Sequence, residues 1–190
     1  MKKIIITVFA ASSLLLYSTP SFALFSVSVG MPMGVSYTAE PAAGDSKTES
    51  DGASGYFLGV QLPFAVGLGI DSYKDKMKGT NQTIATSMYN IFYQLPIPVV
   101  NLIIGLGTGN TSFECDDFSD TGKKCADVFK KGSATQWYTS IGVPLLPLFD
   151  IHLSYRSVTS KNSEYTGQGA DGSKSDVSTT VTGVGIAFNF

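Results

Sequence analysis

Residues 176–190, DVSTTVTGVGIAFNF, alternate between two kinds of side chain. From Thr180 onward one set is mostly apolar and ends in two aromatic rings, whereas the other set is small or polar. This period of two predicts a β-strand with unlike faces. An unpaired strand ending on Phe190 would be an aggregation-prone edge. A strand that closes a barrel inside a membrane avoids that edge, because all its backbone groups are paired.

The first 23 residues have the features of a secretory signal peptide. Two lysines precede an apolar run over residues 4–16, and residues 21–23 (SFA) fit a small-x-small cleavage site. The run is shorter than the roughly 20 residues that a spanning helix needs, although an uncleaved N-terminal anchor is the alternative. We therefore expect residues 1–23 to be a cleaved signal and residues 24–190 to form one domain.

Composition and cysteine usage exclude several classes of protein. The chain has 13 basic and 15 acidic residues, which leaves no basic footprint for nucleic acid. After the signal, no apolar run of about 18 residues predicts a spanning helix. Cys115 and Cys125 permit one intrachain disulfide, which is the default in an exported chain. Their spacing is not that of a metal site, and we expect no cofactor.

Seven more segments alternate with a period of two, which predicts eight strands in an antiparallel up-and-down arrangement. Short proline-containing turns and long polar loops follow one another between them. Pro32 removes a ladder donor, so we expect a bulge there. The predicted strands cover residues 25–37, 56–62, 64–71, 88–94, 100–107, 136–143, 149–156 and 180–190, and the long loops cover residues 38–53, 74–81, 111–133 and 160–175.

The positions of the charged residues indicate which face of each strand is on the outside of the barrel. A soluble, lipocalin-like barrel would carry lysine and glutamate on its water-facing strand positions, and the predicted strands contain neither. Only Asp71, Asp150 and Arg156 fall within them, all on the small polar face. A basic group facing lipid would cost roughly 2–4 kcal/mol. The sequence thus favours an all-β transmembrane barrel of eight strands with its apolar face toward lipid.

Aromatic residues near the predicted strand ends fit the interfacial girdles of such a barrel. They are Phe25, Tyr37, Tyr56, Phe64, Tyr93, Trp137, Phe149, Tyr155, Phe188 and Phe190.

Together these features resemble the small outer-membrane barrels of Gram-negative bacteria, of the OmpX and OmpA transmembrane-domain type. The resemblance spans essentially residues 24–190 and rests on pattern. It implies an outer-membrane location, short periplasmic turns and long outer loops. It also implies that the barrel-assembly machinery reads the final strand with Phe188 and Phe190. The other implied partners are periplasmic chaperones, membrane lipid and lipopolysaccharide, and an extracellular ligand at the loops.

Eight strands enclose a lumen wide enough only for side chains. We expect Phe57, Phe92 and Tyr138 to fill it. Asp71 and Arg156 lie at similar heights above their short turns, so they could pair as a gate or as a structural ion pair. The other polar side chains predicted to face the lumen are Gln61, Asn101, Gln136, Asp150 and His152.

His152 lies two residues from both Asp150 and Ser154, which supplies the groups used in nucleophilic hydrolysis. The pair His152 and Ser154 resembles the His-x-Ser pair of outer-membrane lipid A deacylases, with Glu164 as the acid. The flanking residues, the loop position of Glu164 and the inward direction of the pair count against this reading. We expect a hydrogen-bonded lumen histidine and no enzyme.

The acidic residues Glu114, Asp116, Asp117 and Asp120 suggest a calcium loop, but position twelve counted from Asp117 is Val128, which does not fit an EF-hand. A solvated loop pinned by the disulfide is the expectation. For function, the sequence favours a surface protein acting through its loops in adhesion, host interaction or envelope integrity. The alternatives are a narrow porin or a small channel for hydrophobic solutes, and a lipid A deacylase-like enzyme.

Overall fold

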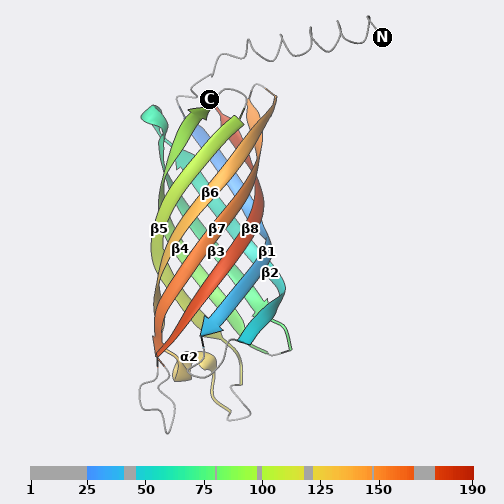
Figure 1. Ribbon diagram of the computed structural model, residues 1–190, viewed down its shortest axis with the longest axis vertical. Coiled ribbons are helices and arrows are strands. Elements are labelled where there is room, and N and C mark those ends of the chain that lie inside the picture. The colour runs from blue at the N-terminus through green and yellow to red at the C-terminus, as the bar shows by residue number, and fades with distance from the viewer. Residues whose placement is uncertain are drawn as a thin grey trace, which may run out of the picture.

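The computed structural model describes residues 25–40, 46–79, 81–97, 100–117, 122–146, 148–164 and 174–190, with side chains except at 37–40, 46–49, 96, 162–164 and 174–176. The predicted signal peptide lies outside these residues. The described chain forms a closed barrel in which eight antiparallel strands follow one another in sequence order (Figure 1). No helix in the described part is long and apolar enough to cross a membrane.

The strands are β1 (Ser26–Glu40), β2 (Ser46–Gln61), β3 (Val66–Met77), β4 (Thr83–Ile97), β5 (Val100–Glu114), β6 (Gly132–Leu146), β7 (Phe149–Glu164) and β8 (Lys174–Asn189). The C-terminus lies at one end of the barrel with the short turns (Figure 1, top). The short helix α2 (Cys125–Val128) lies at the opposite end. We call these the inner and outer ends.

The last strand closes the barrel against the first, as predicted. β8 pairs with β1 from Asn189 opposite Ser26 to Asp176 opposite Glu40. Backbone hydrogen bonds between Phe25 and Phe190 extend this ladder to the end of the chain. The two faces also follow the prediction, since Ala187 is buried while Phe188 is exposed.

The predicted bulge in β1 is present, and it changes which side chains face the lumen. The β1–β8 register shifts between Pro32 and Gly34. Beyond the shift Ser36 is exposed, and Val35 packs against buried lumen residues. Strict alternation over residues 25–37 would place Val35 on the lipid face with Met31, but the extra residue of the bulge reverses the phase and turns Val35 inward.

The strands extend beyond their predicted outer ends. β3 continues through Lys74 and Lys76 to Met77, β5 reaches Glu114, and β7 contains Lys161. The prediction that no strand contains a lysine or a glutamate was therefore wrong, and the long loops are shorter than expected. At the inner end β3 begins only at Val66, because Pro63–Ala65 form a 3-10 turn in which Phe64 has a φ of 75°.

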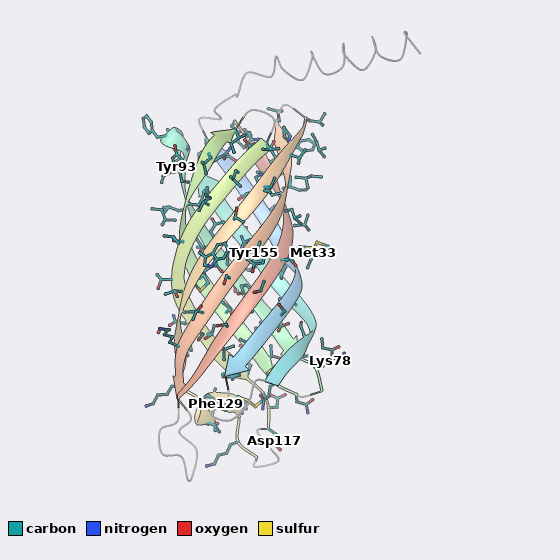
Figure 2. The ribbon with its side chains drawn as sticks, viewed as in Figure 1. Met33, Lys78, Tyr93, Asp117, Phe129 and Tyr155 are labelled. Atoms are coloured by element: carbon teal, nitrogen blue, oxygen red, sulfur yellow. A yellow bond between two sulfur atoms is a disulfide. The ribbon has the colours of Figure 1, made fainter. Side chains whose placement is uncertain are left out.

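Large apolar side chains cover the outer wall as a belt. Its outermost members are Met33, Tyr56, Ile70, Tyr89, Leu106, Trp137, Tyr155 and Val184 on β1 to β8, and we call this line the belt boundary. Figure 2 shows Met33 and Tyr155 at a similar height on the barrel, with Tyr93 near the inner end. Of the predicted girdle residues, those with described side chains lie on this outer wall or at its inner turns.

The belt boundary lies parallel to the membrane plane only if the strands are tilted away from the barrel axis. One cross-strand row joins Tyr56 on β2 to Lys161 on β7 through successive paired residues. On β7, however, the boundary residue is Tyr155, six residues before Lys161. Six residues rise about 20 Å along a strand, and five strand spacings span about 24 Å. The belt boundary therefore lies parallel to the membrane plane when the strands are tilted by about 40° from the barrel axis. This tilt is within the range of transmembrane barrels.

Candidate functional site

The middle of the lumen is closed by a buried ion pair between two aromatic rings. The Nε of Arg156 donates to Oδ2 of Asp71 at 3.0 Å, and both side chains are at least nine-tenths buried. The guanidinium carbon lies 3.6 Å from the ring centroid of Phe57 and 4.7 Å from that of Tyr138. Gln136 donates to the same carboxylate oxygen at 2.7 Å. Strands β2, β3, β6 and β7 thus meet across the lumen at one cluster.

Glycines make room for the lumen rings. Gly67 is paired directly with Phe92, and Gly105 directly with Tyr138. A Cβ on Gly105 would lie 2.2 Å from a ring carbon of Tyr138, and a Cβ on Gly67 would lie 2.0 Å from one of Phe92. Each ring therefore occupies the space above a glycine on the neighbouring strand, which lets a narrow barrel hold aromatic side chains.

The outer part of the lumen is filled by apolar side chains. Met88, Val158 and Val181 are at most 1% exposed. Farther out, Ile84 and Val177 form a buried cluster against which Val35, Met77 and Phe113 pack. Met88 and Val181 lie on the strand faces predicted for the lumen, whereas Ile84, Val158 and Val177 fall beyond the predicted strand ends.

The predicted disulfide joins Cys115 to Cys125, the first residue of α2 at the outer end of the barrel (Figure 1). Cys125 and Val128 of α2 are buried, and the ring of Phe129 lies 5.1 Å from that of Phe113. Phe129 and Asp117 both lie at this end (Figure 2). We call residues 122–131 the outer cap. Through Phe113 the cap rests on the apolar cluster that fills the outer lumen.

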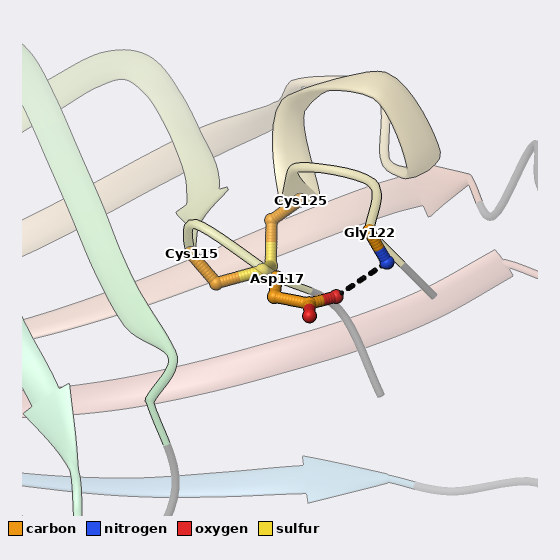
Figure 3. The surroundings of a disulfide bond; sticks show 4 residues. All are labelled: Cys115, Asp117, Gly122 and Cys125. Carbon is orange, nitrogen blue, oxygen red and sulfur yellow. Dashed lines mark hydrogen bonds between the residues drawn. A yellow bond between two sulfur atoms is a disulfide. The ribbon is translucent and has the colours of Figure 1, made fainter. Parts of the chain in front are cut away.

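The acidic loop holds itself together through a hydrogen bond. Asp117 accepts from the backbone N–H of Gly122 at 2.7 Å, beside the disulfide (Figure 3). Glu114 forms an ion pair with Lys74 at 2.6 Å. Within the described residues, no three His, Cys, Asp or Glu side chains gather as metal ligands. Asp120 lies outside the described residues.

His152 and Asp150 lie in the inner half of the lumen, but the serine beside the imidazole is not the predicted one. Nδ1 of His152 lies 3.2 Å from the hydroxyl of Ser140 on the neighbouring strand. Its Nε2 lies 3.8 Å from Oδ2 of Asp150, whereas Ser154 donates to the carbonyl of Gly183. Pairing His152 with Ser154 was therefore wrong. Residues two apart on a strand share a face, but here the hydroxyl group directed at the imidazole comes from the adjacent strand.

The acid proposed for hydrolysis lies far from this histidine. Glu164 is the last residue of β7, twelve positions beyond His152. At about 3.3 Å per residue the two backbone positions are roughly 40 Å apart. His152 is also buried and has the Cβ position of Gly142 within 2.4 Å of its ring. This arrangement offers no access for a lipid acyl chain from the membrane.

The inner end of the lumen is a polar hydrogen-bonded cluster. Oδ2 of Asp150 accepts from Asn101 at 2.5 Å and from Asn189 at 3.1 Å. Gln61 and Ser26 are buried at the same end. Asn189 lies on the small polar face of β8, which was predicted to face the lumen. The cluster satisfies the carboxylate of Asp150.

A small cavity lies between the inner cluster and the central ion pair. About 50 Å³ of it is open to a water-sized sphere, and its polar walls include Ser28, His152, Ser154 and Arg156. This space suits a few water molecules. Nε2 of His152 and one terminal nitrogen of Arg156 have no hydrogen-bond partner among the described protein groups. Phe57, Phe92 and Tyr138 also line this cavity.

An apolar belt around a closed, tilted barrel with a lumen filled by side chains defines a small transmembrane β-barrel of the outer-membrane class. The protein is located in the outer membrane of a Gram-negative-type bacterium. In fold the chain is similar to Neisserial surface protein A, at 12% identity and a TM-score of 0.61, over 87% of this chain and 97% of that one.

Two more solved structures match with TM-scores below 0.5. They are outer membrane protein W of E. coli, at 11% identity and a TM-score of 0.49 over 86% and 97% of the two chains, and OprG of Pseudomonas aeruginosa, at 12% and 0.45 over 87% and 95%. No family model and no protein with a curated description matches the sequence. The comparisons therefore establish the fold.

Proposed function

We propose that this barrel is a non-enzymatic surface protein that binds an extracellular partner through its outer end, in adhesion or host interaction. The observation that carries the proposal is the filled lumen. The buried cluster around Arg156 closes its middle, and Met88, Val158 and Val181 close its outer part. A barrel without a path through it acts at its ends or its outer wall.

The outer end also has the properties of a binding platform. The disulfide holds the outer cap in one arrangement, and a fixed loop loses less conformational entropy when it binds a partner. The cap itself carries exposed groups of both signs, including Lys123, Lys124 and Asp127. The catalytic alternative has no comparable support, because His152 and Glu164 lie on the same strand far apart.

The filled lumen predicts that the purified protein does not conduct ions. Reconstituted into planar bilayers after refolding, the barrel should give no steady single-channel current, because the Arg156 cluster leaves no continuous water path. The folded state is verified first by its β-sheet circular dichroism spectrum. Reproducible unitary currents would instead support the narrow porin.

If the barrel adheres through its outer cap, replacing the cap should reduce binding to host cells. Bacteria displaying a variant in which a short glycine-serine linker replaces residues 115–131 should bind host cells or matrix proteins much less than bacteria displaying the unchanged barrel. The matched control replaces residues 78–82, the β3–β4 connection, with the same linker, and surface amounts are equalised with an epitope tag. Equal binding by the cap variant would remove the adhesion proposal.

A further inference from the structure

The ladder between β1 and β2 is interrupted in the middle of the barrel wall. Pairing stops at Gly30 opposite Phe57 and resumes at Ser36 opposite Glu49. Between these pairs, five residues of β1 and seven residues of β2 have no paired residue on the facing strand. We call this stretch the wall interruption. Because regular pairing resumes beyond it, the wall interruption is not a frayed strand end.

Both strands carry a bulge along the wall interruption. On β1 the register against β8 shifts between Pro32 and Gly34, and on β2 the register against β3 shifts between Ser50 and Ala53. A bulge bends its strand and leaves an extra residue unpaired. Pro32 also lacks the backbone N–H that a ladder needs. Because the two bulges lie on facing strands, they disturb the same part of the ladder from both sides.

Side-chain interactions hold both ends of the wall interruption. At its outer end, the hydroxyl of Ser50 donates to Asp75 and accepts from the backbone N–H of Gly52 at 3.1 Å. At its inner end, the ring of Phe57 lies against the guanidinium of Arg156, with the guanidinium carbon 3.6 Å from the ring centroid. The length of the wall interruption is therefore fixed by specific contacts.

Small residues form the β2 side of the wall interruption. Residues 50–55 read SDGASG, and Gly52 and Gly55 have φ values of 126° and 144°, which favour glycine. The large outward side chains on β1 are Met31 and Met33, which are 57% and 68% exposed. Methionine is unbranched and flexible, so it adapts to a change of shape. Met33 is a belt boundary residue, so the wall interruption lies where lipid meets water.

An apolar cluster lies behind the wall interruption. Phe57, Tyr73 and Val181 are buried together, and Val35 packs against them. Val35 is paired with Val181 on β8, and Tyr73 is paired with Gly55 on β2. The cluster therefore joins side chains from both sides of a stretch that the ladder does not join.

We propose that the wall interruption is a conformational device, at which the barrel opens and closes from the side without unfolding. The stretch has no continuous ladder to break, so a local opening there requires less free energy than elsewhere in the wall. β1 stays paired with β8 and β2 with β3, so the rest of the barrel remains closed. An opening gives small molecules access to Phe57, Tyr73 and Val181 from the belt boundary.

Cysteine labelling measures the opening. Val181→Cys places a thiol in the cluster behind the wall interruption, and the matched control Val158→Cys places one beside Met88 and Ala134, behind continuous pairings. Both valines are at most 1% exposed, and the native cysteines are joined in a disulfide. In phosphatidylcholine vesicles, N-ethylmaleimide should label Val181→Cys roughly tenfold or more faster than Val158→Cys. Equal rates, or faster labelling of the control, would overturn the proposal.

Removal of the bulges tests whether they cause the opening. Deleting Met33 and Gly52 takes one extra residue from each strand, so that β1 and β2 can pair regularly with β8 and β3. In this background Val181→Cys should be labelled as slowly as Val158→Cys, with the fold verified first by circular dichroism. If labelling stays fast, the bulges do not govern the opening and the proposal is wrong.

Hydrogen exchange gives a second measurement that needs no variant. In the unchanged barrel, the amides of residues 31–35 and 53–56 that point toward the wall interruption should exchange roughly tenfold or more faster than those of residues 133–136. The control residues lie next to the belt boundary in continuous ladders. Equally slow exchange in all three segments would exclude the opening. None of these measurements involves the outer cap, so their failure would leave the adhesion proposal standing.

Discussion

Arg156→Ala should lower the free energy of unfolding by about 3–5 kcal/mol, because it leaves a buried carboxylate without its counter-charge. Asp71 would keep only the hydrogen bond from Gln136, and the rings of Phe57 and Tyr138 would lose the guanidinium between them. Urea unfolding from phosphatidylcholine vesicles measures this, with the fluorescence of the single tryptophan, Trp137, as the signal.

A double-mutant cycle separates the ion pair from the packing. Asp71→Asn with Arg156→Met removes both charges and keeps an apolar chain between the rings, so the double variant should be more stable than the sum of the single changes predicts. Lys161→Ala, on the same strand but exposed, is the control and should change stability by less than about 0.5 kcal/mol. Full additivity of the Asp71 and Arg156 changes would mean that the pair is not coupled.

Gly105→Ala should destabilise the barrel by about 1–3 kcal/mol or prevent refolding, because the new methyl group would occupy the place of the Tyr138 ring. The ring cannot move outward without leaving the lumen, and its shift would also displace Arg156. The same vesicle assay measures the loss, and the fraction refolded is recorded for each variant.

A compensating change tests whether the ring is the cause. Gly105→Ala with Tyr138→Ala should be less destabilised than the sum of the two single variants, since the smaller side chain admits the methyl group. Ser87→Ala on the exposed wall of the neighbouring strand β4 is the control. If Gly105→Ala alone leaves stability unchanged, the lumen is not packed as described.

The sequence predicted the features of this barrel that a lipid environment requires. Inside the bilayer the side chains of a strand must alternate between the lipid face and the lumen face. Phe57, Phe92 and Tyr138 could therefore be assigned to the lumen by counting residues. The short turns fix the height of each strand, which is why Asp71 and Arg156 could be expected to meet. The closing role of β8 followed from the same logic, because a barrel in lipid has no open edge.

The rest depended on information that alternation does not carry. Above the membrane, lipid no longer excludes charge, so Lys74 and Lys161 looked like loop residues although their strands continue. Ser140 is the partner of His152 because of the register between β6 and β7, which one strand read alone cannot give. Val35 turned inward because a bulge reverses phase, and the presence of a bulge was predicted without that consequence.

The seam between β1 and β8 also sets the order in which the barrel can form. There the hydroxyl of Thr182 donates to the carbonyl of Gly34, from 148 residues away in the sequence. Such a contact has a high entropic cost until the intervening strands have brought its ends together. The seam therefore closes last. A chain stopped before β8 would leave two unpaired edges in lipid, so assembly of this barrel is complete or unproductive.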